Sequence, residues 1–279
     1  MRSLGIDVGV GKGLDVVLLD ERRVPLHAAS RVHVPDVRRL ILDLRPDVIA
    51  IDSPPRWAAS GRSRLTEREL AALNISSFNT PSEEHGAGNR FFAWMEVGFE
   101  VFAQAAAAGF QSYSAGSPRG KALEVFPHAT AVVLAGSLAP KGARKHTWRA
   151  AVLRSQGVRT DDLGSRDRID AALAALTGLY ALEGRRFAPG DPREGVIVVP
   201  SASLPATPYR PAVAPPREAE PLFTYCACGD LACDQLVRGE FAPGHDAKRK
   251  ARLWDRARAG AEALDELRTR GWKLPPEMR

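Results

Sequence analysis

The sequence predicts an α/β domain built on a mixed β-sheet that is flanked by helices. Residues 4–10, 14–19 and 23–34 are extended apolar segments joined by short turns with glycine, which is typical of antiparallel hairpins. Residues 48–51 form a continuous apolar run, as in a buried parallel strand. Residues 166–182 carry apolar side chains at helical spacing. Together they indicate a three-strand antiparallel meander followed by strand–helix units.

The remaining segments predict the other elements that complete this sheet and cover it. Apolar residues recur at helical spacing after Asp36, which predicts a helix through Leu44 with Asp36 as its N-cap. Pro127 is expected to end a short strand. Further helices are expected over residues 62–74, 91–110 and 147–156, and further strands over residues 122–126 and 195–199.

The chain is expected to divide into a large domain and a small appended unit. Its 279 residues suit one full domain with an addition. Residues 1–200 contain all the strands expected for the sheet, and residues 201–221 are rich in proline, which predicts a stiff linker. Residues 222–279 hold a cysteine cluster and a long basic helix, so we expect a small, mainly helical unit there.

Composition and charge restrict the classes of protein that need to be considered. The chain is 44% hydrophobic and 26% charged, which is ordinary for a globular protein. No run approaches the roughly 18–20 apolar residues of a membrane span, and Asp7 interrupts the apolar run that a signal peptide would need. We therefore expect a cytoplasmic protein with no membrane partner. The net charge of +6 favours polyanionic partners only mildly.

Two aspartates are expected to meet at the carboxyl ends of neighbouring central strands. Asp7 lies in the first strand and Asp52 ends the fourth, and one right-handed crossover would make these two strands neighbours. Ligand sites of open α/β sheets form at that edge. Because two carboxylates placed there repel each other, a bound cation is the usual compensation.

Three further carboxylates fit the same site. Asp167 and Asp170 are three residues apart near the start of the last helix, so they share a face where the helix dipole favours anions. Glu124 is flanked by apolar residues in another expected strand. Any one such residue is more often a cap or a turn former, so the prediction depends on the whole set.

This set of carboxylates predicts metal-dependent hydrolysis of a phosphodiester. Mg²⁺ and Mn²⁺ prefer oxygen ligands, and two such ions can clamp the attacking and leaving oxygens. The candidate catalytic residues are Asp7, Asp52, Glu124, Asp167 and Asp170.

Several segments, in order along the chain, resemble the DUF429 family, which is described as predicted nucleases with an RNase H-like fold. They are residues 5–13, 51–55, 124–129, 167–172 and 194–200. The resemblance covers about residues 3–200 and implies that fold, with nuclease activity on nucleic acid. The segment 167–172 also resembles the last acidic motif of RuvC-type Holliday junction resolvases. By that likeness the metal-binding positions are Asp7, Asp52, Asp167 and Asp170, and Glu124 has no counterpart.

The first turn supports a second enzymatic hypothesis. Residues 9–13 could cradle a phosphate, with Lys12 as a donor, although their spacing is not that of a Walker A motif and a tight hairpin turn is the commoner explanation. Actin-like ATPases and sugar kinases share the expected core and bind ATP phosphates on the first hairpin. An ATP-dependent phosphotransferase or ATPase is therefore one alternative, and a non-catalytic module that binds nucleic acid or protein is another.

The C-terminal unit has its own candidate metal site. Cys226, Cys228, Cys233 and His245 could form a structural zinc site, and a small unit often needs such a metal. The one-residue spacing of the first pair departs from the usual pattern, and free thiols are the alternative. The basic stretch 248–258 could contact phosphates or simply be a solvated helix face.

Overall fold

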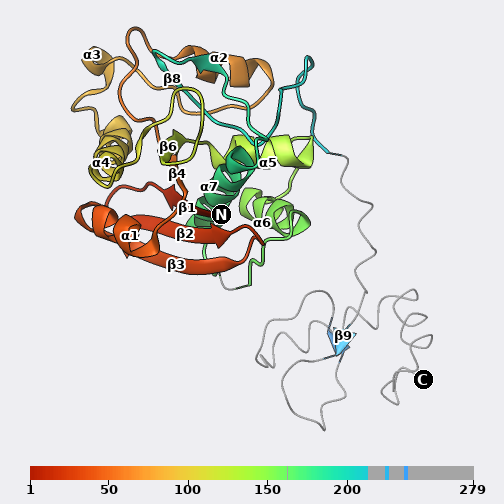
Figure 1. The fold of residues 1–279 in the computed structure, drawn as a ribbon. Helices are drawn as coiled ribbons and strands as arrows, with labels where there is room; N and C mark the ends of the chain where they lie inside the picture. Colours follow the sequence, from red (N-terminus) through yellow and green to blue (C-terminus); the bar gives the residue numbers. More distant parts are fainter. Residues whose placement is uncertain (162, 213–223, 226–235, 238–279) are drawn as a thin grey trace, which may run out of the picture. The chain divides into compact units, whose positions relative to one another are not determined.

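The computed structural model divides the chain into two units, Met1–Val213 and Ala214–Arg279. Figure 1 shows the first unit as an α/β domain. Residues whose structure is described are 1–161, 163–212, 224–225 and 236–237.

Of the second unit, the structure describes one short antiparallel pairing, between β9 (Thr224–Tyr225) and β10 (Leu236–Val237). The predicted basic helix and the four predicted zinc ligands lie outside the described residues, and these ligands are Cys226, Cys228, Cys233 and His245.

The central sheet has six strands in the order β3-β2-β1-β4-β6-β5. The strands are β1 (Arg2–Asp7), β2 (Leu14–Asp20), β3 (Pro25–Val32), β4 (Val48–Asp52), β5 (Gln111–Ser112) and β6 (Lys121–Glu124). The first three form an antiparallel meander, and β4 continues the sheet parallel to β1, with β6 parallel to β4. This arrangement confirms the predicted fold class, an RNase H-like mixed sheet in which the first and fourth strands are neighbours.

Glycine sets the turn between β1 and β2. Gly11 and Gly13 have φ angles of 78° and 80°, a region that glycine enters without steric cost. A Cβ atom on Gly13 would also come within 2.8 Å of the backbone of Arg31. This hairpin therefore needs glycine at this position, and its geometry fixes which residue of β2 lies opposite Asp7.

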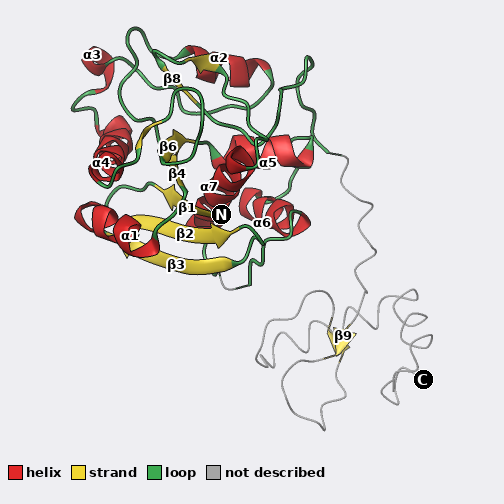
Figure 2. Ribbon diagram, viewed as in Figure 1, coloured by secondary structure: helices red, strands yellow, loops and turns green. Residues whose placement is uncertain are grey.

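Helices cover both faces of the sheet (Figure 2). On one face, α7 (Arg166–Leu182) lies across β1, β2 and β4, and α5 (Pro127–Ala135) and α6 (Lys145–Ser155) pack against it. On the other face lie α1 (Val37–Leu44) and α4 (Ala93–Ala107), which contact each other. The central strands are therefore buried on both sides.

Strand β2 shows how alternation produces these two cores. Val17 and Leu19 pack in the cluster that contains α7, whereas Val16 and Leu18 pack in the cluster that contains α1 and α4. Successive side chains of a strand point to opposite faces, so a strand covered on both faces must be apolar throughout.

Helix α7 lies unusually close to β1 because small residues line the contact. A Cβ atom on Gly5 would be 1.9 Å from the carbonyl oxygen of Ala171, and one on Gly178 would be 2.1 Å from the Ser3 hydroxyl oxygen. Gly5 cannot accept a side chain without moving the helix, because backbone atoms of Ala171 and Ala175 fill the space, whereas at Gly178 the side chains of Ser3 and Val48 fill it. The close approach brings the first turn of α7 to the end of β1 where Asp7 lies.

Two helix starts differ in detail from what the sequence predicts. Pro127 follows the end of a strand, as predicted, but it also begins α5, a helix that was not predicted, because a proline at the first helical position loses no hydrogen bond. Asp36 stands at the N-cap position of α1 but makes no side-chain capping bond. Its backbone is already helical, with φ −84° and ψ −12°, because the 3₁₀ turn Val34–Asp36 runs directly into the helix.

The remaining short elements are not part of the six-stranded sheet. They are α2 (Leu65–Ala72), α3 (Glu83–Gly86), the 3₁₀ turn η2 (Arg90–Phe92), β7 (Gly190–Asp191) and β8 (Gly195–Val196). The start of the proline-rich segment also joins this unit, since Leu138 donates a backbone hydrogen bond to Arg210. Within the described part of the chain, none of the helices combines the length and hydrophobicity needed to cross a bilayer.

Candidate active site

Five aspartates gather around the carboxyl end of β1. Asp7 is the register partner of Asp52 in parallel β4 and of Asp15 in antiparallel β2. Asp167 comes from the first turn of α7, and Asp170 follows three residues later on the same helix. Carboxylate oxygens of Asp7, Asp15 and Asp167 lie within 4.8 Å of one another. Asp170 is close enough to raise the pKa of both Asp7 and Asp52. The structure thus brings the four predicted aspartates to one place and adds a fifth.

Asp15 is the member of this group that the sequence prediction missed. It is buried near the start of β2, and the hydroxyl of Ser30 donates a hydrogen bond to it. The hairpin register could have identified it, because β1 and β2 pair symmetrically about Gly11 and this symmetry places Asp15 opposite Asp7.

Burial and mutual repulsion perturb the two central carboxyls. The pKa of Asp7 rises to about 9, mainly through burial and then through the charges of Asp52, Asp170 and Asp167. The pKa of Asp52 rises to about 8, again mainly through burial and then through Asp170. Both groups therefore hold a proton at neutral pH when no cation is bound. A divalent ion among them would favour their ionised forms.

Two basic side chains neutralise part of the acidic charge. Lys12, from the turn between β1 and β2, forms an ion pair with Asp167, and this hydrogen bond raises the pKa of Lys12. Arg149, from α6, donates to both carboxylate oxygens of Asp170 at 2.7 and 2.5 Å. Burial nevertheless keeps the pKa of Asp170 above its usual value. Among the described residues, two basic side chains thus form ion pairs with a group of five aspartates. The group could therefore accept further positive charge.

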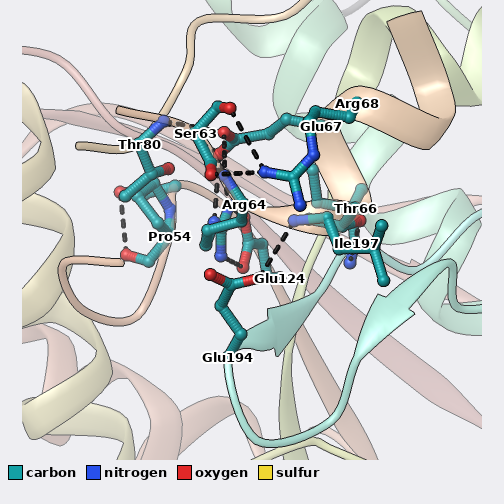
Figure 3. A network of polar contacts seen from close by, with 12 residues as sticks. Pro54, Ser63, Arg64, Thr66, Glu67, Arg68, Thr80, Glu124, Glu194 and Ile197 are labelled. Atoms are coloured by element: carbon teal, nitrogen blue, oxygen red, sulfur yellow. Dashed lines mark hydrogen bonds and ion pairs between the residues drawn. The ribbon is translucent and has the colours of Figure 1, made fainter. Parts of the chain in front are cut away.

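Glu124, the remaining predicted site residue, belongs to a different network (Figure 3). Nη1 and Nη2 of Arg64 donate to its two carboxylate oxygens at 2.7 and 2.5 Å. The same guanidinium lies 2.9 Å from Oε1 of Glu67, and Arg64 is only 1% exposed. Both oxygens of Glu124 therefore have a cationic partner, and the structure joins it to Arg64 rather than to the aspartates.

Backbone groups complete the network of Arg64. The N–H of Thr80 donates to both oxygens of Glu67 at 2.9 Å, and the N–H of Leu65 donates to Glu194 at 3.0 Å. These bonds fasten the start of α2 and the segment that follows it to the end of β6. The spacing of Arg64 and Glu67 was visible in the sequence, but no local pattern pairs Arg64 with a residue sixty positions away.

A cavity of about 500 Å³ lies beside the aspartates. Asp52 and Arg149 line it on the side of the acidic group, and the Arg64 network lines another part. Much of the remaining lining is aromatic, with contributions from Phe78, Phe91, Trp94 and Phe126. The acidic group thus opens onto a space of the size that small-ligand sites usually have.

Two solved structures of RuvC from Thermus thermophilus are similar to the chain. The structure of RuvC alone is 15% identical, with 66% of this chain and 97% of that chain covered and a TM-score of 0.37. The structure of RuvC in complex with Holliday junction substrate is 17% identical, with 66% and 96% covered and a TM-score of 0.37. No curated protein matches the chain. The model of the family described as "Protein of unknown function (DUF429)" matches residues 5–194. The chain therefore belongs to the DUF429 family.

Proposed function

We propose that this protein is a divalent-metal-dependent hydrolase that cleaves phosphodiester bonds of nucleic acid. The observation that carries the proposal is the convergence of Asp7, Asp15 and Asp167 within 4.8 Å, with Asp52 and Asp170 close by. These carboxylates come from two central strands, the neighbouring strand β2 and a helix that packs closely on the sheet. Such a costly gathering of negative charge calls for a cation.

The chemistry of the donor set fits Mg²⁺ or Mn²⁺. The candidate ligands are carboxylate oxygens, which these hard cations prefer, whereas structural zinc usually takes sulfur and nitrogen ligands. Asp7, Asp15 and Asp167 would hold one ion, and Asp52 and Asp170 would contribute to a second. When bound, the metal would supply an activated water and would stabilise the leaving oxygen.

The basic residues have separate roles in this proposal. Lys12 holds Asp167 while no metal is bound and would be released when an ion takes over that carboxylate. It would then be free to contact a phosphate oxygen of the substrate. Arg149 keeps Asp170 oriented and also faces the adjoining cavity.

A direct test compares cleavage of branched, duplex and RNA–DNA hybrid substrates in Mn²⁺. We expect the wild-type protein to cleave at least one of them and the double variant Asp7→Asn, Asp170→Asn to be inactive. The matched control is Asp43→Asn, since Asp43 is exposed on α1 and its ion-pair partner among the described residues is Arg39. Equal cleavage by the wild-type protein and the double variant would reject the proposal.

A further inference from the structure

We propose that the cavity beside the aspartates binds a single unpaired nucleobase of the nucleic-acid substrate. This inference rests on the proposed function, because it takes the aspartates as the place where the backbone is cut. The cavity shares Asp52 and Arg149 with that acidic group. A base seated in the cavity would therefore be attached to a phosphate that lies close to the aspartates.

The aromatic wall has the properties of a stacking surface. Phe78 and Phe91 are 62% and 59% exposed, although phenylalanine is among the residues most often buried. The Phe78 ring centroid lies 5.8 Å from that of Phe91 and 5.9 Å from that of Trp94, with interplanar angles of 72° and 59°. The rings hold one another in place without stacking face to face. Ring faces therefore remain available for a flat ligand.

Polar atoms in the same cavity lack partners. The hydroxyl oxygen of Ser77 and Nε of Arg149 are buried and make no hydrogen bond to any residue that the structure describes. Buried polar groups are nearly always paired, so these two enclosed groups would gain partners if their side chains turned toward a ligand in the cavity. The edge of a nucleobase offers both donors and acceptors to such groups.

These two features together select the ligand. An inorganic phosphate would use the unpaired donors but not the aromatic rings, and an aliphatic ligand would leave the donors unpaired. A nucleobase has a flat apolar face and a hydrogen-bonding edge, and stacking on aromatic side chains is a general way of holding unpaired bases. The ligand class is therefore a base that has left its duplex, such as one in a bulge, a loop or a branch point.

The test uses binding without turnover. The probes are a DNA duplex with one unpaired 2-aminopurine and the same duplex with an abasic site at that position. Both are titrated with the full-length protein in EDTA, and affinity and 2-aminopurine fluorescence are measured. We expect the wild-type protein to bind the duplex with the base about tenfold more tightly than the abasic duplex. We also expect the bound base to change its fluorescence.

Variants of the cavity residues test whether this cavity causes the preference for the duplex with the unpaired base. Phe78→Ala and Trp94→Ala should reduce the preference to less than about twofold while the abasic duplex binds as before. Phe187→Ala is the matched control, because Phe187 is also an exposed phenylalanine (38%) but does not line the cavity. Since Phe78 is the most exposed ring, its variant should fold normally even if Trp94→Ala does not.

The outcomes separate this inference from the proposed activity. Cleavage in Mn²⁺ without any preference for the base would overturn the base pocket alone. A preference that depends on Phe78, without cleavage of any substrate, would support the pocket and overturn the hydrolase. Binding of free adenosine monophosphate but of neither duplex would reassign the cavity to free nucleotides, and binding of no probe at all would also overturn the inference.

Discussion

Two groups of buried carboxylates lie at the ends of neighbouring strands, and they are neutralised in different ways. Glu124, at the end of β6, is adjacent in register to Ile51 of β4, directly before Asp52. Arg64 donates a hydrogen bond to each of its carboxylate oxygens, so the protein itself supplies the positive charge that Glu124 needs. The group around Asp7 contains five aspartates but only Lys12 and Arg149 as ion-pair partners within the described residues. Glu124 thus has a cationic partner for both of its oxygens, whereas the aspartate group is suited to receive a cation from solution.

This contrast indicates how structural and functional carboxylates can be told apart in a buried site. A carboxylate with a buried guanidinium partner contributes to the fold, and removing the partner exposes a large desolvation cost. Burial raises the pKa of Glu124 as well, so the distinguishing feature of the Asp7 group is that several like charges face one another with few cationic partners. Stability, cleavage, pH dependence and metal affinity should therefore respond differently when each group is altered.

Removing the guanidinium of Arg64 should have the largest effect. Arg64→Met leaves Glu124 and Glu67 buried without their partner, and we expect the free energy of unfolding to fall by about 3–5 kcal/mol. Urea denaturation measures this change. The control is Arg68→Met on the same helix, because Arg68 is exposed and bonds only to Ser63. A loss below about 1 kcal/mol for Arg64→Met would remove the distinction between the two groups.

Asp7→Asn should have the opposite profile. The Asp7 carboxyl is protonated at pH 7 without metal, since its pKa is about 9, so folding must bind a proton that the ionised carboxyl of the unfolded chain lacks. An amide of the same shape avoids this cost, so Asp7→Asn should keep or raise the unfolding free energy of the metal-free protein. Cleavage in Mn²⁺ should fall by about a hundredfold or more, because even residues that only support metal ligands cost 10–100-fold. Strong destabilisation of the metal-free variant would show that Asp7 holds the fold together, as Arg64 does.

The pH dependence of stability should also distinguish the groups. The pKa values of Asp7 and Asp52 are about 9 and 8 in the folded protein, against 3.8 as the ordinary value, so the folded state binds more protons than the unfolded state between these limits. Metal-free stability should therefore decrease as pH rises from about 5 to 9, by roughly 1.4 kcal/mol per pH unit for each extra proton that the folded state binds.

Metal should offset that decrease, because the ion binds the ionised carboxylates more tightly as pH rises. Mn²⁺ at about one hundred times its Kd should add about 2.7 kcal/mol. Thermal unfolding at several pH values, with and without Mn²⁺, provides the comparison, and Asp7→Asn should flatten the slope. A metal-free protein whose stability increases over this range would contradict the assignment.

Lys12→Ala should have the smallest effect. The ion pair with Asp167 is partly exposed, so its loss should change the unfolding free energy by no more than about 1 kcal/mol. Because Lys12 and the metal compete for Asp167, Mn²⁺ should bind about twofold more tightly to the variant, as calorimetric titration would record. Arg39→Ala, which removes the exposed pair with Asp43, is the control and should leave the Mn²⁺ affinity unchanged. Weaker Mn²⁺ binding to Lys12→Ala would contradict the competition.

Much of the fold could be predicted from the sequence because its central strands are strongly patterned. The apolar run 48–51, the glycine turns and the long helix after residue 165 each determine one local structure. One crossover rule was then enough to place Asp52 beside Asp7. Helix α5 was not predicted, because a proline that follows a strand can also begin a helix, and whether it does depends on tertiary packing.

The candidate site was predicted less completely, because two of its features depend on distant pairing. Asp15 becomes part of the group only through the register of the first hairpin, which the turn length determines. Glu124 has the same apolar flanks as a site residue would have, and only the partner Arg64 from a distant segment distinguishes it. The cavity joins side chains from loops, helices and strand ends, and no local sequence pattern describes such a set.

The close contact between α7 and β1 has a consequence for any attempt to redesign this protein. Gly5 has no room for even one methyl group, because the carbonyl oxygen of Ala171 occupies the space. Gly5→Ala would push α7 outward and carry Asp167 and Asp170 away from Asp7, although every carboxylate would still be present. An inactive variant of this kind would keep all the expected ligands and would be mistaken for an intact site in any inspection limited to those residues. The spacing between helix and strand thus determines whether the five aspartates converge as much as the presence of the acids does.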